Sequence, residues 1–172
     1  PQIGVVLMVT KEHLDYHKNL NEYHSAKNAI TKFQTVGDTA VINADYPASK
    51  KIGNLGKGQK IYVSRFQPVK PGCFVKQGEI FYCAPKSKPE KILPLSKLKL
   101  LGEHNWENVC AAVAAAKAAG CGQKAIVKAL TTFSGLPNRL ELVAEKNGIK
   151  FYNDSFSTTP ETTIAAVEAV KE

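Results

Sequence analysis

Residues 1–45, "PQIGVVLMVTKEHLDYHKNLNEYHSAKNAITKFQTVGDTAVINAD", indicate the fold class of this chain. The apolar run Val5–Val9 is typical of a buried, parallel strand. Asn19 is a suitable N-cap for a helix over residues 20–33, on which apolar side chains recur every three or four positions. A second strand is predicted at residues 39–45. The order strand, helix, strand favours an α/β fold with a mostly parallel sheet.

The pattern of predicted elements changes in the middle of the chain. A third strand is predicted at residues 59–66, and residues 68–94 then read as short strands and turns, with a hairpin that turns near Gly78. We expect this part to form a small antiparallel appendage. Two helices follow, at residues 103–119 and 123–133.

The segment "SGLPNR", residues 134–139, has the Gly and Pro content of a linker. We therefore predict two domains, residues 1–134 and 135–172. The second begins with a hairpin that turns at Asn147-Gly148 and continues into a helix after Thr159-Pro160. The first strand has no initiating Met before it and the last helix no C-cap glycine, so we expect a piece of a longer protein.

The net charge is +8, from 23 Lys and Arg against 15 Asp and Glu. A basic chain suits a polyanionic partner, but the lysines are dispersed and the only arginines are Arg65 and Arg139. A solvated surface is therefore favoured over a nucleic-acid interface. Nucleic-acid binding would predict retention on heparin that falls steeply with salt.

The four cysteines show neither CxxC spacing nor the companion histidines of a zinc site. Cys83 lies in a strand pattern and Cys110 in a helix pattern, which indicates buried thiols in a reducing cytoplasm. No apolar run approaches the roughly 20 residues of a membrane span. We expect a cytoplasmic protein with no membrane partner.

Two residues near the first strand are candidates for chemistry. His13 follows the carboxyl end of that strand, where open α/β sheets bind ligands. Lys27 lies one turn past Tyr23 on the apolar side of its helix, where burial of an ammonium without a partner is costly. Exposed polar residues at a helix entry are the alternative interpretation for both.

Asn105 and Asn108 form a second candidate pair at the start of the helix "HNWENVCAAVAAAKA". They lie three positions apart, so they share one helical face. An amide side chain can both donate to and accept from the N6 and N7 edge of adenine. The alternative, with Asn105 as a helix cap and Trp106 in the core, leaves Asn108 unexplained.

Beyond the linker, Arg139 carries a planar guanidinium that can hold a phosphate or stack on a ring. Asp154 ends a predicted strand, where a carboxylate can accept hydrogen bonds from a ribose. An Asx-turn is the alternative for Asp154. The chain has no GxxxxGK[ST] loop, so these residues alone do not grip a triphosphate in the usual way.

Five segments in this order resemble the Mur ligase family: "EHLDYHKNLNEYHSAK", "NAD" after a strand, "LLGEHNWENVCAAVAAAKAAG", "FSGLPNRLELV" and "FYNDSFSTTPETTIAAV". The resemblance implies the latter part of a central ATPase domain plus the first β-hairpin and helix of a Rossmann-like C-terminal domain. The last segment resembles the type that adds D-glutamate to UDP-N-acetylmuramoyl-L-alanine. In that reaction ATP forms an acyl phosphate, which the amine of D-glutamate attacks.

The resemblance also implies roles for individual residues. His13 is expected to bind one of two Mg²⁺ ions, and Lys27 to be carbamylated and to bind Mg²⁺ as an anion. Asn105 and Asn108 match positions that contact the adenine of ATP. Arg139 and Asp154 match positions around its phosphates and ribose.

The chain departs from the family pattern at three positions. Glu12 replaces the usual Asp before the His. Asn138 stands where a His is common, and we assign it to the nucleotide contacts. Phe156 stands where the D-glutamate-adding type often has a Lys. Thr158 matches a substrate-contacting threonine, and with it we assign Ser155 to the substrate.

Three hypotheses therefore remain from the sequence. The first is a ligase that is a monomer when complete and uses ATP and small-molecule substrates, with this piece inactive alone. The second is a non-catalytic nucleotide- or protein-binding module derived from such a domain. The third is a Mur-type ligase with a different amino acid acceptor.

Overall fold

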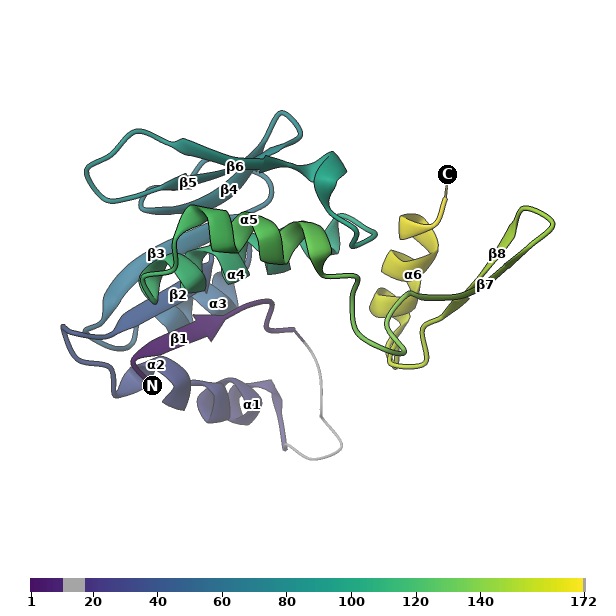
Figure 1. Ribbon diagram of the computed structural model, residues 1–172. Coiled ribbons are helices and arrows are strands. Elements are labelled where there is room, and N and C mark those ends of the chain that lie inside the picture. Colours follow the sequence, from purple (N-terminus) through teal and green to yellow (C-terminus); the bar gives the residue numbers. More distant parts are fainter. Residues whose placement is uncertain (11–17, 172) are drawn as a thin grey trace.

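The computed structural model describes residues 1–10 and 18–171, and its main element is a six-stranded sheet (Figure 1). The strands follow the order of the sequence, β1 through β6. β1 to β4 run parallel, whereas β5 and β6 are antiparallel to their neighbours. The strands are β1 (Ile3–Val6), β2 (Thr39–Asn43), β3 (Gln59–Ser64), β4 (Gly72–Lys76), β5 (Glu79–Cys83) and β6 (Glu90–Pro94).

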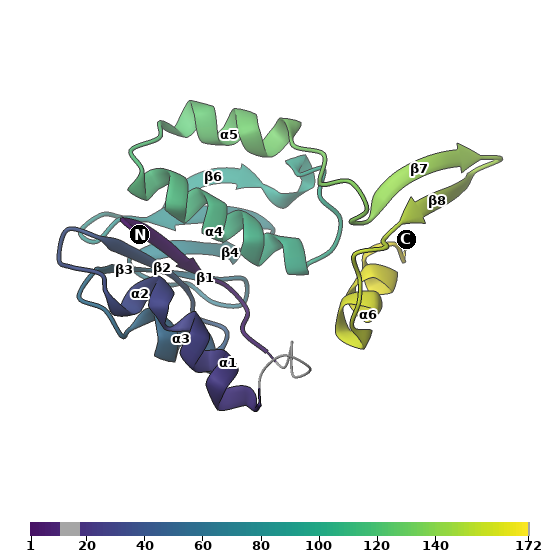
Figure 2. The ribbon, with the colours of Figure 1, turned by 90° about the horizontal axis from the view of Figure 1, so that it is seen from below.

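Helices cover both faces of this sheet (Figure 2). Ile42 of β2 faces Gly53 in α3, while the preceding Val41 belongs to the core formed with α4. Successive strand residues point to opposite faces, so β2 is buried on both sides. The helices are α1 (Leu20–Lys27), α2 (Ala29–Lys32), α3 (Pro47–Gly53), the short 3₁₀ turn Leu95–Lys97, α4 (His104–Ala118) and α5 (Gln123–Thr132).

The predicted parallel α/β sheet is confirmed, with differences in detail. The first strand begins and ends earlier than the apolar run Val5–Val9 suggests. Val5 is 37% and Met8 44% exposed, so this run is not fully buried. Within the described residues β1 pairs with β2 alone and thus lies at the sheet edge, where one face of the strand is not covered.

Of three other expectations, one is confirmed and two change. Asn19 does cap α1, where its side chain accepts from the Glu22 backbone at 3.0 Å. The helix predicted over residues 20–33 is two helices, α1 and α2, separated at Asn28. The strands between residues 68 and 94 are antiparallel as predicted, but they continue the main sheet through β4 instead of forming a separate appendage. Helix α3 is not foreseen by the sequence analysis.

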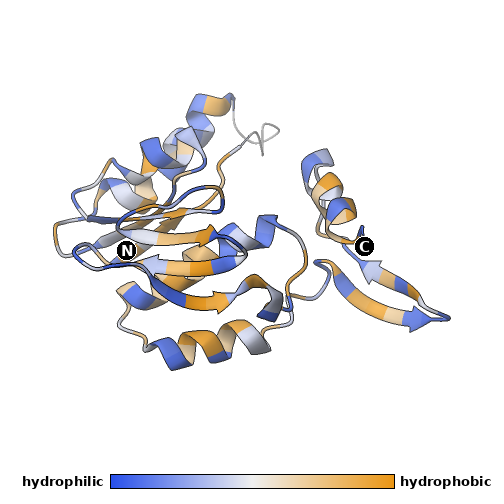
Figure 3. Ribbon diagram, turned by 90° about the horizontal axis from the view of Figure 1, so that it is seen from above, coloured by the Kyte–Doolittle hydropathy of each residue, from blue (hydrophilic) through white to orange (hydrophobic). Residues whose placement is uncertain are grey.

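The C-terminal residues form a smaller unit beside the sheet (Figure 1). The predicted hairpin is present, with Asn147 and Gly148 at positive φ in its turn. Figure 3 shows hydrophobic residues along the strands and polar residues in the connecting loops. This unit comprises β7 (Glu141–Lys146), β8 (Ile149–Asn153) and α6 (Pro160–Ala169), and the boundary between residues 134 and 135 stays a prediction.

Candidate functional site

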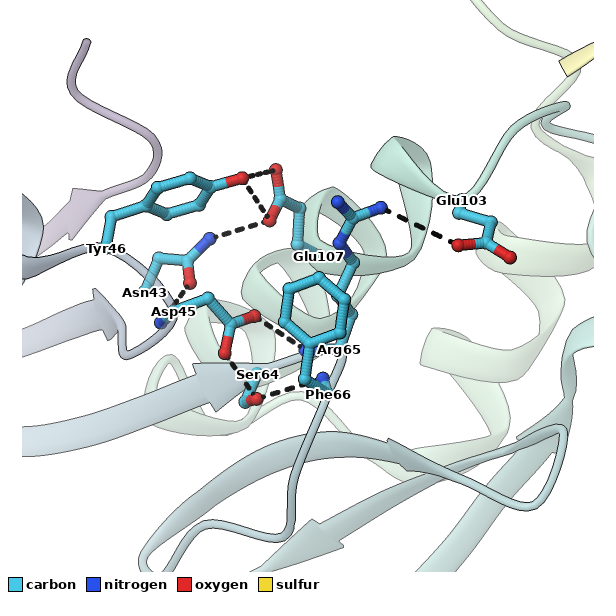
Figure 4. Close-up of polar contacts among 8 residues, drawn as sticks. All are labelled: Asn43, Asp45, Tyr46, Ser64, Arg65, Phe66, Glu103 and Glu107. Atoms are coloured by element: carbon cyan, nitrogen blue, oxygen red, sulfur yellow. Dashed lines mark hydrogen bonds and ion pairs between the residues drawn. The ribbon is translucent and has the colours of Figure 1, made fainter. Parts of the chain in front are cut away.

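A cluster of polar side chains lies where the carboxyl ends of β2 and β3 meet the start of α4 (Figure 4). Parallel strands bring their carboxyl ends to one edge of a sheet, and ligands of open α/β sheets bind there. The cluster consists of Asn43 at the end of β2 with Asp45 and Tyr46 after it, Ser64 at the end of β3 with Arg65 and Phe66 after it, the α4 cap residue Glu103, and Glu107 in the first turn of α4.

Glu107 connects α4 to the loop after β2. Its side chain is buried, and its Oε2 accepts from Asn43 Nδ2 at 3.0 Å. The Tyr46 hydroxyl lies 3.3 Å from Oε1 and 3.2 Å from Oε2 of the same carboxylate and donates to it. Asn43 is fully buried, and its Oδ1 accepts from the Asp45 backbone at 3.0 Å. The carboxylate therefore fixes the first turns of α4 against the end of β2.

The pKa of the Tyr46 phenol is shifted by its burial and by the neighbouring Glu107 carboxylate. Burial raises the pKa of Tyr46 to about 12 from 10.0, and the charge and hydrogen bond of Glu107 act in the same direction. Folding thus favours the neutral phenol. Its contribution to the free energy of unfolding is present below pH 10.0 and is lost as the pH rises toward about 12.

Asp45 connects the ends of β2 and β3. Its Oδ1 accepts from the Ser64 hydroxyl at 2.6 Å and its Oδ2 from the Arg65 backbone at 2.9 Å. Ser64 Oγ in turn accepts from the backbone N–H groups of Phe66 and Gln67, each at 3.1 Å. The loop after β3 is therefore held in one conformation by side-chain hydrogen bonds.

His104, the first residue of α4, lies close to charges from both parts of the chain. Burial lowers the pKa of His104 below 6.5, and so do the charges of Arg65 and Arg139, whereas Asp154 raises it. The neutral ring is favoured in the fold. The stabilisation is present above pH 6.5 and is lost as the pH falls below it. Arg139 and Asp154 are thus placed within electrostatic reach of the start of α4.

Arg65→Ala is expected to move the pKa of His104 upward, toward its ordinary value, because one cation beside the ring is removed. The ring protons of His104 can be followed by NMR across the acid range. Lys76→Ala, which removes a cation from the exposed β4–β5 turn, is the matched control and should leave the titration unchanged. An unshifted His104 in Arg65→Ala would show that Arg65 does not act on the ring.

Asn105 and Asn108 lie together as predicted, but Asn105 is not the helix cap. The cap position is Glu103, whose side chain makes no cap hydrogen bond. Asn105 instead donates from Nδ2 to the Leu101 carbonyl at 2.7 Å and accepts from Asn108 Nδ2 at 3.1 Å. Asn108 is the more exposed of the two. Contact with adenine stays a prediction for both.

The residues assigned to ribose and phosphate lie at the junction with the C-terminal unit. Asp154 accepts from the Leu140 backbone at 3.0 Å and from the Ser157 hydroxyl. Asn138 has a positive φ, and its Oδ1 accepts from Asn153 Nδ2 at 2.8 Å. The Arg139 guanidinium lies 5.9 Å from the centre of the Phe156 ring. Asp154 therefore also organises its own loop.

The two residues assigned to the substrate, Ser155 and Thr158, are both exposed. The Ser155 backbone donates to Asn153 Oδ1 at 3.2 Å, so the Asx-turn of this loop forms at Asn153 and not at Asp154. Ser155 also lies beside Asp154 in a shallow groove between the hairpin and α6. Their contact with substrate stays a prediction.

Lys27 lies at a second groove, along the β1 edge. The expectation that its ammonium is buried is wrong: Lys27 is exposed, and Tyr23 takes the buried position on α1. Lys27 Nζ lies 5.2 Å from the centre of the Tyr23 ring. The groove has a volume of about 630 Å³ and is lined by Val5–Val9 and by α1. His13 lies outside the described residues.

Among the described residues, the cysteines and acidic groups form no cluster suited to a metal ion. Cys83 and Cys110 are buried free thiols, as predicted, and Cys73 is buried as well. Burial raises the pKa of Cys73, and a hydrogen bond with Cys110 adds to the effect. Across residues 1–10 and 18–171 no three His, Cys, Asp or Glu side chains are grouped to hold a metal ion. None of the helices in these ranges has the length and apolar character that a bilayer crossing requires.

Sequence reasoning missed most of the cluster in Figure 4. The segment Asn43–Asp45 enters the prediction only as a family motif, and Ser64 and Glu107 are not selected at all. A signal was available, because polar residues follow directly on two predicted parallel strands. Glu107 had no local signal, since its partners lie about sixty residues earlier in the chain.

Proteins of known function align with nearly the whole chain. The chain is 39% identical over 172 residues to UDP-N-acetylmuramoylalanine–D-glutamate ligase of Bacillus pumilus, with 100% of this chain and 37% of the relative covered. It is 41% identical over 170 residues to the enzyme of the same name from Acidobacterium capsulatum, with 98% and 37% covered. The chain thus spans little more than a third of these relatives.

Solved structures share the fold. MurF from Acinetobacter baumannii superimposes with a TM-score of 0.77 at 22% identity, over 98% of this chain and 37% of that one. A pseudomurein peptide ligase type C from Methanothermus fervidus gives 0.72 at 19% identity, over 99% and 41%. The model of the Mur ligase middle domain matches residues 1–116, which is more than half of the chain. This protein therefore belongs to the Mur ligase family.

Proposed function

We propose that the complete protein that carries these 172 residues is an ATP-dependent ligase of peptidoglycan biosynthesis. It joins D-glutamate to UDP-N-acetylmuramoyl-L-alanine, and the 172 residues alone are inactive. One observation carries the proposal: relatives named for this activity align with the whole chain at 39% identity. We further propose that it acts as a monomer and that it lies in the cytoplasm. The buried free thiols support the cytoplasmic location, because cysteines stay reduced there.

The proposed reaction proceeds in two steps. The carboxylate of UDP-N-acetylmuramoyl-L-alanine attacks the γ-phosphorus of ATP, which forms an acyl phosphate and releases ADP. The amine of D-glutamate then attacks the acyl carbon, loses a proton, and expels phosphate as the amide bond forms. Every reacting oxygen carries negative charge, so the site must supply cations and oriented N–H donors.

The nucleotide is proposed to lie between the start of α4 and the loop that carries Asp154. Asn105 and Asn108 contact the adenine, Asp154 the ribose, and Arg139 with Asn138 the phosphates. The charges of Arg139 and Asp154 both act on His104, which supports their convergence on the α4 start. Ser155 and Thr158 are proposed to contact the substrate.

Mg²⁺, when bound, neutralises phosphate charge and polarises the phosphoryl group. Lys27 and His13 are the residues proposed to hold Mg²⁺. Two Mg²⁺ ions are expected in the complete enzyme. An ammonium repels Mg²⁺, so Lys27 must first lose a proton to give a neutral amine, which then reacts with CO₂ to form a carbamate anion and release a second proton. The exposure of the Lys27 side chain supports this, because CO₂ has access to Nζ. Oxygen donors are the ligands that Mg²⁺ prefers.

The complete protein should release phosphate from ATP when UDP-N-acetylmuramoyl-L-alanine and D-glutamate are both present. L-Lysine, meso-diaminopimelate and L-alanine should each give much lower rates. Phosphate release coupled to formation of the new amide, followed by mass spectrometry, measures this. A faster reaction with another amino acid would replace the proposed acceptor, and ATP binding without ligation would favour a non-catalytic module.

Asn108→Ala is expected to raise the KM for ATP by about 3- to 10-fold with little change in kcat, because one hydrogen bond to a neutral base edge is lost. Steady-state kinetics with varied ATP measure the effect. Gln123→Ala is the matched control, since it removes a half-buried amide at the start of α5 that donates to the Lys91 carbonyl at 3.1 Å. Equal KM values in both variants would remove Asn108 from the site.

A further inference from the structure

The Arg65 side chain has more hydrogen-bond donors than the described part of the chain satisfies. A guanidinium carries five N–H donors. Its ion pair with Glu103 spans 4.0 Å, the side chain of Arg65 is 21% exposed, and that of Glu103 is 67% exposed. Arg65 Nε is buried and has no hydrogen-bond partner within residues 1–10 and 18–171. An unpaired buried donor on a charged group is costly and needs an explanation.

Two other carboxylates of the cluster already accept hydrogen bonds from other groups. Both oxygens of Asp45 accept hydrogen bonds, from the Ser64 hydroxyl and the Arg65 backbone. The Glu107 carboxylate accepts from Asn43 and Tyr46. Figure 4 shows the guanidinium extending past these groups toward the start of α4. Within the described residues these two carboxylates have other partners, and a bound ligand can supply an acceptor for Arg65.

The guanidinium is also held in place before any ligand arrives. The Arg65 backbone is fixed by Asp45, and the neighbouring Phe66 ring lies under the guanidinium at 4.6 Å. A planar cation stacked on an aromatic ring keeps its edge free for acceptors. Because little side-chain entropy remains to be lost, binding through this edge is favoured.

We propose that Arg65 is a further nucleotide contact, whose guanidinium donates to phosphate or ribose oxygens of ATP bound at the start of α4. This rests on the proposed function, because it places ATP beside Asn105 and Asn108. A guanidinium can donate to two oxygens at once through two parallel N–H groups, whereas a lysine ammonium acts as a point charge. Arg65 thus adds a contact from the main sheet to those from α4 and from the C-terminal unit.

The test compares nucleotide affinities of the complete protein by calorimetry and competition. Arg65→Ala should weaken ATP binding by about 10- to 100-fold, as expected for loss of charged hydrogen bonds. Arg65→Lys should recover only part of the loss. If ATP and ADP weaken but adenosine does not, the contact is to phosphate; if all three weaken, it is to the ribose.

Two control variants separate binding from structure. Lys76→Ala removes a distant surface cation and should bind ATP like the wild type. Glu103→Gln removes the 4.0 Å ion pair and should bind ATP equally well or more tightly. If Arg65→Ala does not fold, Arg65→Lys carries the test, because it keeps the charge and the aliphatic stem.

Unchanged ATP affinity in folded Arg65→Lys and Arg65→Ala would overturn the inference. So would equal losses in Arg65→Ala and Glu103→Gln, since these would point to the ion pair alone. Failure of the proposed function has a different signature. In that case the wild-type protein itself would not ligate D-glutamate, whatever the behaviour of the Arg65 variants.

Discussion

Lys27→Ala is expected to lower kcat for ligation by roughly 10³-fold or more in the complete protein, with the fold unchanged. The proposed carbamate of Lys27 supplies an anion for Mg²⁺, and alanine removes it. Lys27 is exposed, and its Nζ lies 5.2 Å from the centre of the Tyr23 ring, so we expect little stability to depend on it. Acetate or formate supplied in solution should restore part of the rate, because a free carboxylate can take the place of the carbamate.

Lys32→Ala is the matched control. Lys32 is also an exposed helical lysine whose Nζ lies over an aromatic ring, at 5.6 Å from the centre of Phe33. Its loss should leave kcat unchanged. ¹³C NMR with labelled CO₂ should show a carbamate signal in the wild type and in Lys32→Ala but none in Lys27→Ala. Wild-type activity in Lys27→Ala would remove the carbamate from the mechanism.

The local parts of the fold were predictable because their signals lie within short stretches. The Asn19 cap, the Asn147-Gly148 turn and the helix of Asn105 and Asn108 each follow from neighbouring residues. The pairing between strands does not follow from neighbouring residues. The continuation of the parallel sheet into β5 and β6 depends on β4 lying beside β3, which no local pattern encodes. Helix α3 had a usable signal in Pro47 at its first turn.

In the candidate site, too, residues with a local sequence signal were predictable and residues placed by distant contacts were not. Arg139 and Asp154 were selected from strand-end and linker positions, and their charges do reach His104. Burial was harder to judge: the spacing from Tyr23 predicted a buried Lys27, whereas α1 buries Tyr23 and leaves the lysine in solvent. Glu107 was not selected from the sequence, because only the folded chain brings it to Asn43.

Glu107→Leu is expected to lower the free energy of unfolding by about 2–4 kcal/mol. Leucine leaves the buried Asn43 Nδ2 without its acceptor at 3.0 Å and the Tyr46 hydroxyl without its partner. Each unsatisfied group costs about 1–3 kcal/mol, and relief from burying a carboxylate offsets part of the sum. Chemical denaturation of the 172-residue chain, followed by the fluorescence of Trp106 in α4, measures the change.

Glu107→Gln separates charge from hydrogen bonding. Its amide oxygen can still accept from Asn43 while its amide nitrogen donates to Tyr46, so we expect a loss of about 1 kcal/mol or less. The pKa of Tyr46 should fall in both variants, because the negative charge that helps to raise it is gone. The loss of stability above pH 10.0 should then be smaller and end below about pH 12. If Glu107→Leu instead matches or exceeds the wild type in stability, the carboxylate does not hold the α4 start against the sheet.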